Sequence, residues 1–159
     1  MNKTRKVLVT LSMAAVTLLG AGAAADAAPG RTVSMTGRAE LDTQDPLTTF
    51  EFMVHAKGNG RTGDGVVWMA HHVGDQLAWL VARVDCVRVE GNVGTVTATV
   101  TDAEAFTGAV PGDPISLTVR DNGTKDVIAF GSREQVERKC QAAAGQALEI
   151  TRGDFRLGR

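Results

Sequence analysis

The three histidines are the residues of this chain best suited to bind a metal or to move a proton. His71 and His72 are adjacent, so in a strand they point to opposite faces, and His55 could neighbour one of them across a hairpin. Asp64 and Asp75 lie near the predicted loops. A zinc site needs three or four ligands that converge in space. The spacing therefore favours surface histidines, and we expect no metal and no other cofactor.

One carboxylate stands out because it interrupts an apolar strand. Asp85 there is either buried and functional, or it faces solvent or pairs locally, for example with Arg83 or Arg88. A site built from His55, His71 and Asp85 would suit a hydrolase-like enzyme. The chain has no carboxylate pair that must face each other, no Gly-x-Ser-x-Gly and no phosphate-binding loop. Enzymatic activity is thus uncertain, and its absence is the favoured expectation.

The two tryptophans are the second kind of candidate site residue. The chain has five phenylalanines and no tyrosine, so the tryptophans are expected to fill the core. The alternative is that they line a pocket or a carbohydrate-stacking surface. For that alternative, the candidate ligand-binding residues are Trp68, Trp79, Phe50, Phe52 and Met69.

The N-terminus has the three-part layout of a cleavable secretory signal. Lys3, Arg5 and Lys6 precede an uncharged stretch, and Ala25-Asp26-Ala27 fits an A-x-A cleavage site. A transmembrane anchor is the alternative, but the second half of the stretch is Gly and Ala rather than strongly apolar. We therefore expect a signal peptide over residues 1–27 and a secreted protein, either extracellular or at the cell surface.

The remainder, residues 28–159, is expected to be a single β-rich exported domain. Removing the signal takes away three basic residues and one acid, which leaves 132 residues with a net charge of −3. A mildly acidic domain without basic runs argues against nucleic acid as a partner. No stretch after residue 27 is apolar for long enough to span a membrane.

Cys86 and Cys140 are the only cysteines. An even number in an exported chain predicts a disulfide bond rather than two free buried thiols. By the loop-entropy argument, a bridge over this separation would stabilise the fold by about 4 kcal/mol.

Most of the chain alternates apolar and polar residues with the period of a β-strand. The glycines of Gly58–Gly65 predict a mobile hairpin loop, and Gly91-Asn92 predicts a two-residue hairpin. Threonines at every second position of 95–101 indicate a solvent-facing side of a sheet. We expect strands near residues 32–42, 49–56, 66–72, 77–90, 93–101, 115–119, 128–130 and 147–157, the fourth of which is one bent strand or two short ones.

One helix is expected before the last strand. Ser132 followed by Gln135 is a capping-box pattern, and residues on one face then recur at helical spacing. That face consists of Val136, Cys140 and Ala144. The predicted fold is therefore all-β, an antiparallel barrel or barrel-like sandwich of about seven to nine strands with one short helix. The first and last strands are expected to pair and close it.

Three segments together carry a family resemblance: Val84–Asn92, Val119–Gly123 and Thr151–Phe155. The combination resembles a group of small, exported, uncharacterised bacterial proteins of the high-GC Gram-positive type. The resemblance implies an all-β secreted domain and brings no catalytic residues. Members of the group often have an irregular segment before the last strand, where this chain has the helical pattern that begins at Ser132.

Three functions remain after these exclusions. The first is a secreted binding module for a small apolar or amphipathic ligand. The alternative is a secreted protein-interaction or structural domain that contacts an exported protein through a loop such as Gly58–Gly65. The third is the His/Asp enzyme. A cavity lined by the tryptophans would favour the first, and a filled core would favour the second.

Overall fold

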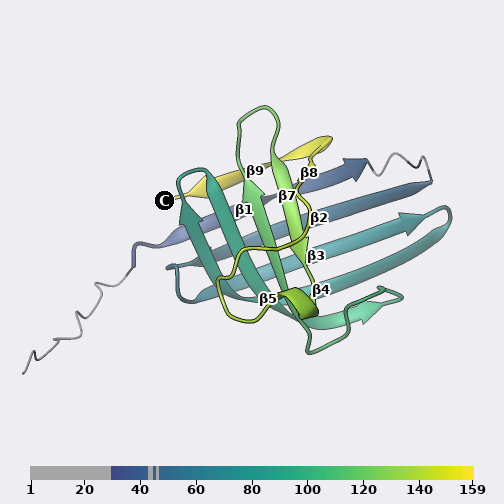
Figure 1. The fold of residues 1–159 in the computed structure, drawn as a ribbon, viewed down its shortest axis with the longest axis horizontal. Coiled ribbons are helices and arrows are strands. Elements are labelled where there is room, and N and C mark those ends of the chain that lie inside the picture. The colour runs from purple at the N-terminus through teal and green to yellow at the C-terminus, as the bar shows by residue number, and fades with distance from the viewer. Residues whose placement is uncertain (1–29, 43–44, 46) are drawn as a thin grey trace, which may run out of the picture.

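The computed structural model describes residues 30–42, 45 and 47–159, and the predicted signal peptide lies outside them. The described residues form one antiparallel sheet of nine strands that curves into a half-barrel (Figure 1). Its strands are β1 (Val33–Asp42), β2 (Thr48–Gly58), β3 (Gly63–Val73), β4 (Gln76–Glu90), β5 (Val93–Glu104), β6 (Pro114–Arg120), β7 (Val127–Gly131), β8 (Leu148–Glu149) and β9 (Arg152–Gly158). Within the described part of the chain, no helix is long and apolar enough to span a membrane.

Each strand from β1 to β7 pairs with the next one along the chain, and the C-terminal segment then contacts both edges of the sheet. Its first part, β8, pairs with β7, and its second part, β9, pairs with β1. The predicted pairing of the first and last strands is confirmed. The predicted single strand over 147–157 is instead two short strands, because the segment crosses from one edge to the other.

The sheet bends along β4, which is one strand of 15 residues. Its register against β5 shifts between Val81 and Ala82 and again between Val84 and Cys86. Such irregularities insert an extra residue and bend a strand. As a result, β5, β6 and β7 cross in front of β1–β4 (Figure 1).

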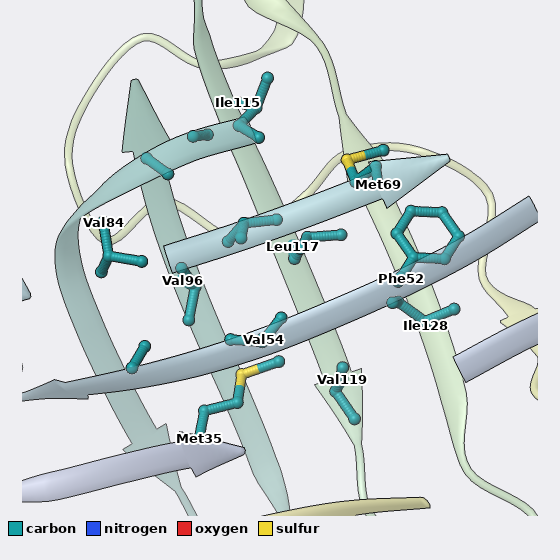
Figure 2. Packing of buried hydrophobic residues seen from close by; sticks show 14 of the residues in the cluster. Met35, Phe52, Val54, Met69, Val84, Val96, Ile115, Leu117, Val119 and Ile128 are labelled. Atoms are coloured by element: carbon teal, nitrogen blue, oxygen red, sulfur yellow. The ribbon is translucent and has the colours of Figure 1, made fainter. Parts of the chain in front are cut away.

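The hydrophobic core fills the space between these two parts of the sheet (Figure 2). The alternation of the sequence directs one set of side chains from each strand inward. Burying one valine, leucine, isoleucine, methionine or phenylalanine side chain stabilises a fold by about 1.5–3 kcal/mol. The inward set includes Met35, Phe52, Val54, Met69, Val84, Val96, Ile115, Leu117, Val119 and Ile128, all at most 4% exposed.

The predicted helix after Ser132 is wrong beyond its first turn. Only a 3₁₀ turn forms, over Arg133–Gln135, where the Gln135 side chain accepts the Ser132 N–H at 3.1 Å. The next residue, Val136, is already extended. Cys140 has φ +57°, which lies outside the range of a right-handed α-helix. In this conformation Cys140 forms its disulfide with Cys86 on the sheet. Residues 136–147, called the strap from here on, therefore run as an irregular segment.

The prediction of a solvent-facing threonine ladder holds for only part of β5. Thr99 and Thr101 are exposed, but Thr95 and Thr97 are 6% and 2% exposed. The strap contacts Thr97 directly, since Thr97 accepts a hydrogen bond from the Cys140 N–H at 3.1 Å. The Thr95 hydroxyl lies 3.4 Å from the Thr118 hydroxyl, which accepts the Ala143 N–H of the strap. The hydroxyl of Thr97 thus binds a backbone amide of the strap in place of water.

The glycine-rich hairpin between β2 and β3 is a short, hydrogen-bonded turn, so the loop is shorter than predicted. Gly58 and Gly63 pair with each other inside the strands, which leaves only residues 59–62 in the loop. A Cβ on Gly63 would lie 2.8 Å from the Val87 nitrogen of β4, so glycine permits the hairpin to pack on that backbone. The Gly60 N–H then donates to the Val87 carbonyl at 2.8 Å.

A buried carboxylate holds the C-terminal segment across the half-barrel. Asp126, which precedes β7 and is 6% exposed, accepts the Asn122 N–H at 2.9 Å and the Phe155 N–H of β9 at 3.2 Å. Its own carbonyl accepts the Ile150 N–H at 2.9 Å. One residue thus joins the turn before β7 to the strand that pairs with β1. No motif or spacing in the sequence marks this residue.

We expect Asp126→Asn to lower the free energy of unfolding by about 1–3 kcal/mol, because an amide donor would face a backbone N–H that needs an acceptor. Urea unfolding followed by circular dichroism measures the change. The matched control is Asp75→Asn in the exposed β3–β4 turn, for which we expect a change below about 0.5 kcal/mol. Equal effects of the two substitutions would contradict the role given to Asp126.

Candidate functional site

The outer face of β1–β4 carries an apolar centre on the side away from the core. The pairing register places Met53 of β2, Trp68 of β3 and Val81 of β4 in one row across three strands. Met53 is 45% exposed, and Trp68 is half-buried. Large apolar side chains that cluster on a solvent-facing sheet mark an interaction surface more often than scattered ones do.

Trp79 of β4 extends this apolar centre by one row. It pairs with Ala70, so it is the diagonal neighbour of Trp68 on the adjacent strand. Its indole N–H donates to Glu104 Oε2 of β5 at 3.2 Å, which holds the ring against the sheet while leaving it half-buried. We call Met53, Trp68, Val81, Ala70 and Trp79 the tryptophan face.

A hollow of about 240 Å³ opens beside the tryptophan face. Its volume is smaller than a pocket for a whole drug-sized molecule, so it suits one ring or one short chain of a larger ligand. The lining combines apolar surface with both signs of charge and consists of Arg38, Ala39, Glu40, Glu51, Phe52, Met53 and Trp68.

Each of the two acids that line the hollow has a basic neighbour outside its lining. Glu40 lies 3.5 Å from Arg152, and Glu51 lies 3.7 Å from His72. These contacts are exposed, so each contributes little to stability. Their effect on recognition is that the rim presents hydrogen-bonding groups of both signs without a strong net field.

The five residues predicted to line one ligand site lie on two different faces. Trp68 and Trp79 are on the outer face and are absent from the buried core, which corrects the expectation that they fill it. Phe52 and Met69 are 4% and 1% exposed inside the half-barrel, and Phe50 packs against the same core. Met53, Arg38 and Glu51 join the tryptophans instead, and no sequence motif had marked them.

The histidines and Asp85 do not form one constellation. As predicted from their adjacency, His71 and His72 face opposite ways. His71 stacks on Phe50 inside, with ring centroids 4.0 Å apart, and its buried Nε2 has no hydrogen-bond partner among the described residues. His55 pairs with Val66 on the outer face, five positions along β3 from His71. The described residues contain no group of three His, Cys, Asp or Glu side chains placed to hold a metal ion.

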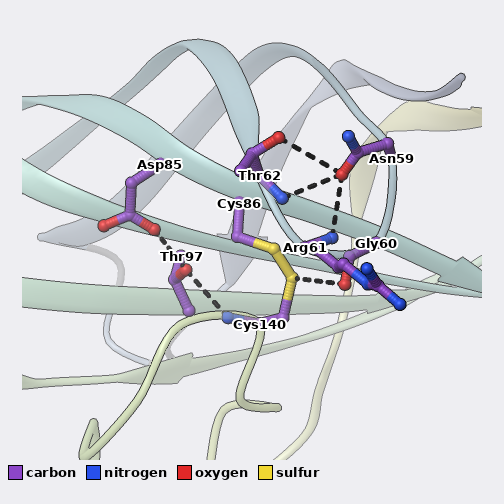
Figure 3. The surroundings of a disulfide bond; sticks show 8 residues. All are labelled: Asn59, Gly60, Arg61, Thr62, Asp85, Cys86, Thr97 and Cys140. Atoms are coloured by element: carbon purple, nitrogen blue, oxygen red, sulfur yellow. Dashed lines mark hydrogen bonds between the residues drawn. A yellow bond between two sulfur atoms is a disulfide. The ribbon is translucent and has the colours of Figure 1, made fainter. Parts of the chain in front are cut away.

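Asp85 has a local partner, but not one of the two arginines considered. It lies at the second register shift of β4 and accepts the Thr97 hydroxyl at 2.6 Å. Thr97 in turn accepts the Cys140 N–H, so a carboxylate, a hydroxyl and a backbone amide form one chain of hydrogen bonds (Figure 3).

The predicted disulfide between Cys86 and Cys140 is present beside this chain of hydrogen bonds (Figure 3). The two Cα atoms are 5.4 Å apart, and 54 positions separate the residues in sequence. Cys86 is fully buried on β4, whereas Cys140 is half-buried on the strap and its Sγ lies 3.3 Å from the Gly60 carbonyl oxygen. The bridge thus ties the strap to β4 beside the point where the Gly60 N–H of the β2–β3 hairpin donates to the Val87 carbonyl.

Comparison with known proteins finds no matching family model, curated protein or solved structure. The resemblance to exported bacterial proteins therefore stays an expectation. The evidence on function is the geometry of the tryptophan face and of the cluster around the disulfide.

We expect Thr97→Val to lower the free energy of unfolding by about 1–3 kcal/mol, because it leaves the Asp85 carboxylate and the Cys140 N–H without their shared partner. Hydrogen exchange should also quicken at the strap amides. Thr99→Val on the same strand is the control, since Thr99 is exposed, and should change stability by less than about 0.5 kcal/mol. Unchanged exchange in the strap of Thr97→Val would show that this hydroxyl does not hold it.

Proposed function

We propose that this chain is an exported binding protein that holds an uncharged amphipathic ligand on the tryptophan face. The observation that carries the proposal is that both tryptophans of the chain lie on neighbouring strands of the outer face, half-buried and close to the exposed Met53. Export is supported by the sequence pattern at the N-terminus and is compatible with the disulfide.

The packing of the interior favours a surface site over an enclosed one. Core side chains from every strand between β1 and β7 fill the half-barrel. A ligand held inside would need space that these side chains occupy, because protein interiors are close-packed. Recognition is therefore assigned to the outside of the sheet.

The chemistry of the tryptophan face fits a ligand with an apolar side and a polar edge. Indole rings offer a flat apolar surface, and Arg38, Glu40 and Glu51 line the neighbouring hollow as donors and acceptors. A neutral oligosaccharide has both features, since its rings expose C–H groups on their faces and hydroxyls along their edges. A strongly charged ligand would gain little from a rim that carries both signs of charge.

A protein partner is the second candidate for the same face. An apolar centre that contains tryptophan and methionine within a polar rim is the usual composition of a protein–protein contact. Leu77, 49% exposed on β4, favours this reading because it lengthens the apolar strip past Trp79.

Intrinsic fluorescence reports on the tryptophan face directly, because the chain has two tryptophans and no tyrosine. Titration with cellotetraose and with N-acetylated chitotetraose should change the emission of the wild-type protein. We expect Trp68→Ala and Trp79→Ala each to weaken binding by about tenfold, the equivalent of about 1.4 kcal/mol, as measured by calorimetry.

Val110→Ala is the control, because Val110 is an exposed apolar residue in the loop between β5 and β6, away from the tryptophan face. It should bind like the wild type. If no neutral glycan on an array binds in a Trp68-dependent way, the proposed ligand class is refuted. A captured exported protein that is lost with Trp68→Ala would then favour the second candidate.

A further inference from the structure

A second hollow, of about 510 Å³, lies on the outer face of β5–β7 next to the strap. It is separate from the tryptophan face, which occupies the outer side of β2, β3 and β4. The sheet forms the floor of the hollow, and the strap forms a wall. The lining is Val93, Thr118, Arg120, Asn122, Val127, Ala129, Ala143, Gly145 and Ala147.

The floor of this hollow is built from two rows of paired strand residues. Arg120 of β6 lies between Val93 of β5 and Val127 of β7. In the next row, Thr118 lies between Thr95 and Ala129. Valine and alanine side chains thus surround one arginine at the end where the floor is most exposed.

Arg120 is a cation without a counter-ion among the described residues. The two acids closest to it in the strand register are Glu90, beyond Val93, and Glu149, beyond Val127. Glu90 pairs with Arg88, and Glu149 lies 2.9 Å from Lys125. Both carboxylates are therefore neutralised by other cations, which leaves the Arg120 guanidinium available to an anion.

The strap forms the wall of the hollow without filling it. Its residues at the hollow are Ala143, Gly145 and Ala147, whose small side chains leave the space open. The Ala143 N–H donates to Thr118 Oγ1 at 2.8 Å, and Gly145 packs so closely on Phe130 that a Cβ would overlap the Phe130 carbonyl oxygen. The disulfide at Cys140 then fixes the strap to β4.

From these contacts we propose that the hollow beside the strap binds the anionic head and the adjoining apolar chain of a monocarboxylate amphiphile such as a medium-chain fatty acid. A guanidinium offers two parallel N–H donors that match a carboxylate. The Asn122 side chain lines the same end, and Val93, Val127 and Ala129 receive the first carbons of the chain. Because the strap supplies the opposite wall, the site requires the Cys86–Cys140 bridge.

The test is calorimetric titration of the oxidised protein with decanoate below its micellar concentration, in parallel with decanol and decyltrimethylammonium. We expect one decanoate per chain, and weaker binding by about tenfold for Arg120→Gln, as for loss of one charge-assisted contact. Arg83→Gln, on the outer face of β4, is the matched control and should bind decanoate like the wild type.

Two further arms separate this site from the tryptophan face and from a loss of folding. Trp68→Ala should keep its decanoate affinity, and decanoate should leave the tryptophan emission unchanged. Mild reduction with a dithiol, under which circular dichroism still shows the sheet, should abolish decanoate binding. Equal binding of all three probes, binding unaffected by Arg120→Gln, or no decanoate binding to the oxidised protein would each overturn the proposal.

Discussion

The curvature of this sheet depends on how its C-terminal segment is held across the open side, and that depends on Asp126. Strand β9 has a pairing partner on one side only, so the Phe155 N–H points away from the ladder. An unpaired edge group needs an acceptor, because leaving a buried donor without one costs about 1–3 kcal/mol. The Asp126 carboxylate supplies it from the far edge of the sheet. An open, flat sheet would instead expose the side chains that now form the core.

The curvature of the sheet divides the side chains into a filled interior and an outer face. The outside is not uniform. Over β2–β4 it presents tryptophan and methionine beside paired charges, whereas over β5–β7 it presents hydroxyls and small apolar residues covered partly by the strap. A shift of one residue in the pairing of a strand would exchange its inner and outer faces. The two register shifts between β4 and β5 therefore help to determine which residues face solvent.

The strands could be predicted from the sequence because alternation is a local property, but the faces could not always be assigned. In 66–72 both alternating sets are apolar, one with Val67 and Met69 and the other with Trp68, so the pattern cannot tell inside from outside. The pairing of Trp68 with the exposed Met53 of β2 places Trp68 on the outer face. Likewise, the capping pattern at Ser132 is satisfied by a single turn. The path of the strap beyond that turn is set by the distant partner of Cys140, which no local pattern records.

The strap shows why the compartment matters to this structure. None of its side chains is fully buried, so it gains little from the hydrophobic effect. Cys140 also adopts a left-handed conformation that costs a residue with a Cβ about 1–2 kcal/mol. Two hydroxyl acceptors, Thr97 and Thr118, offset only part of the entropy cost of ordering the strap. The covalent bond to Cys86 therefore adds to the few contacts that hold the strap, and with it the wall beside Arg120, against the sheet.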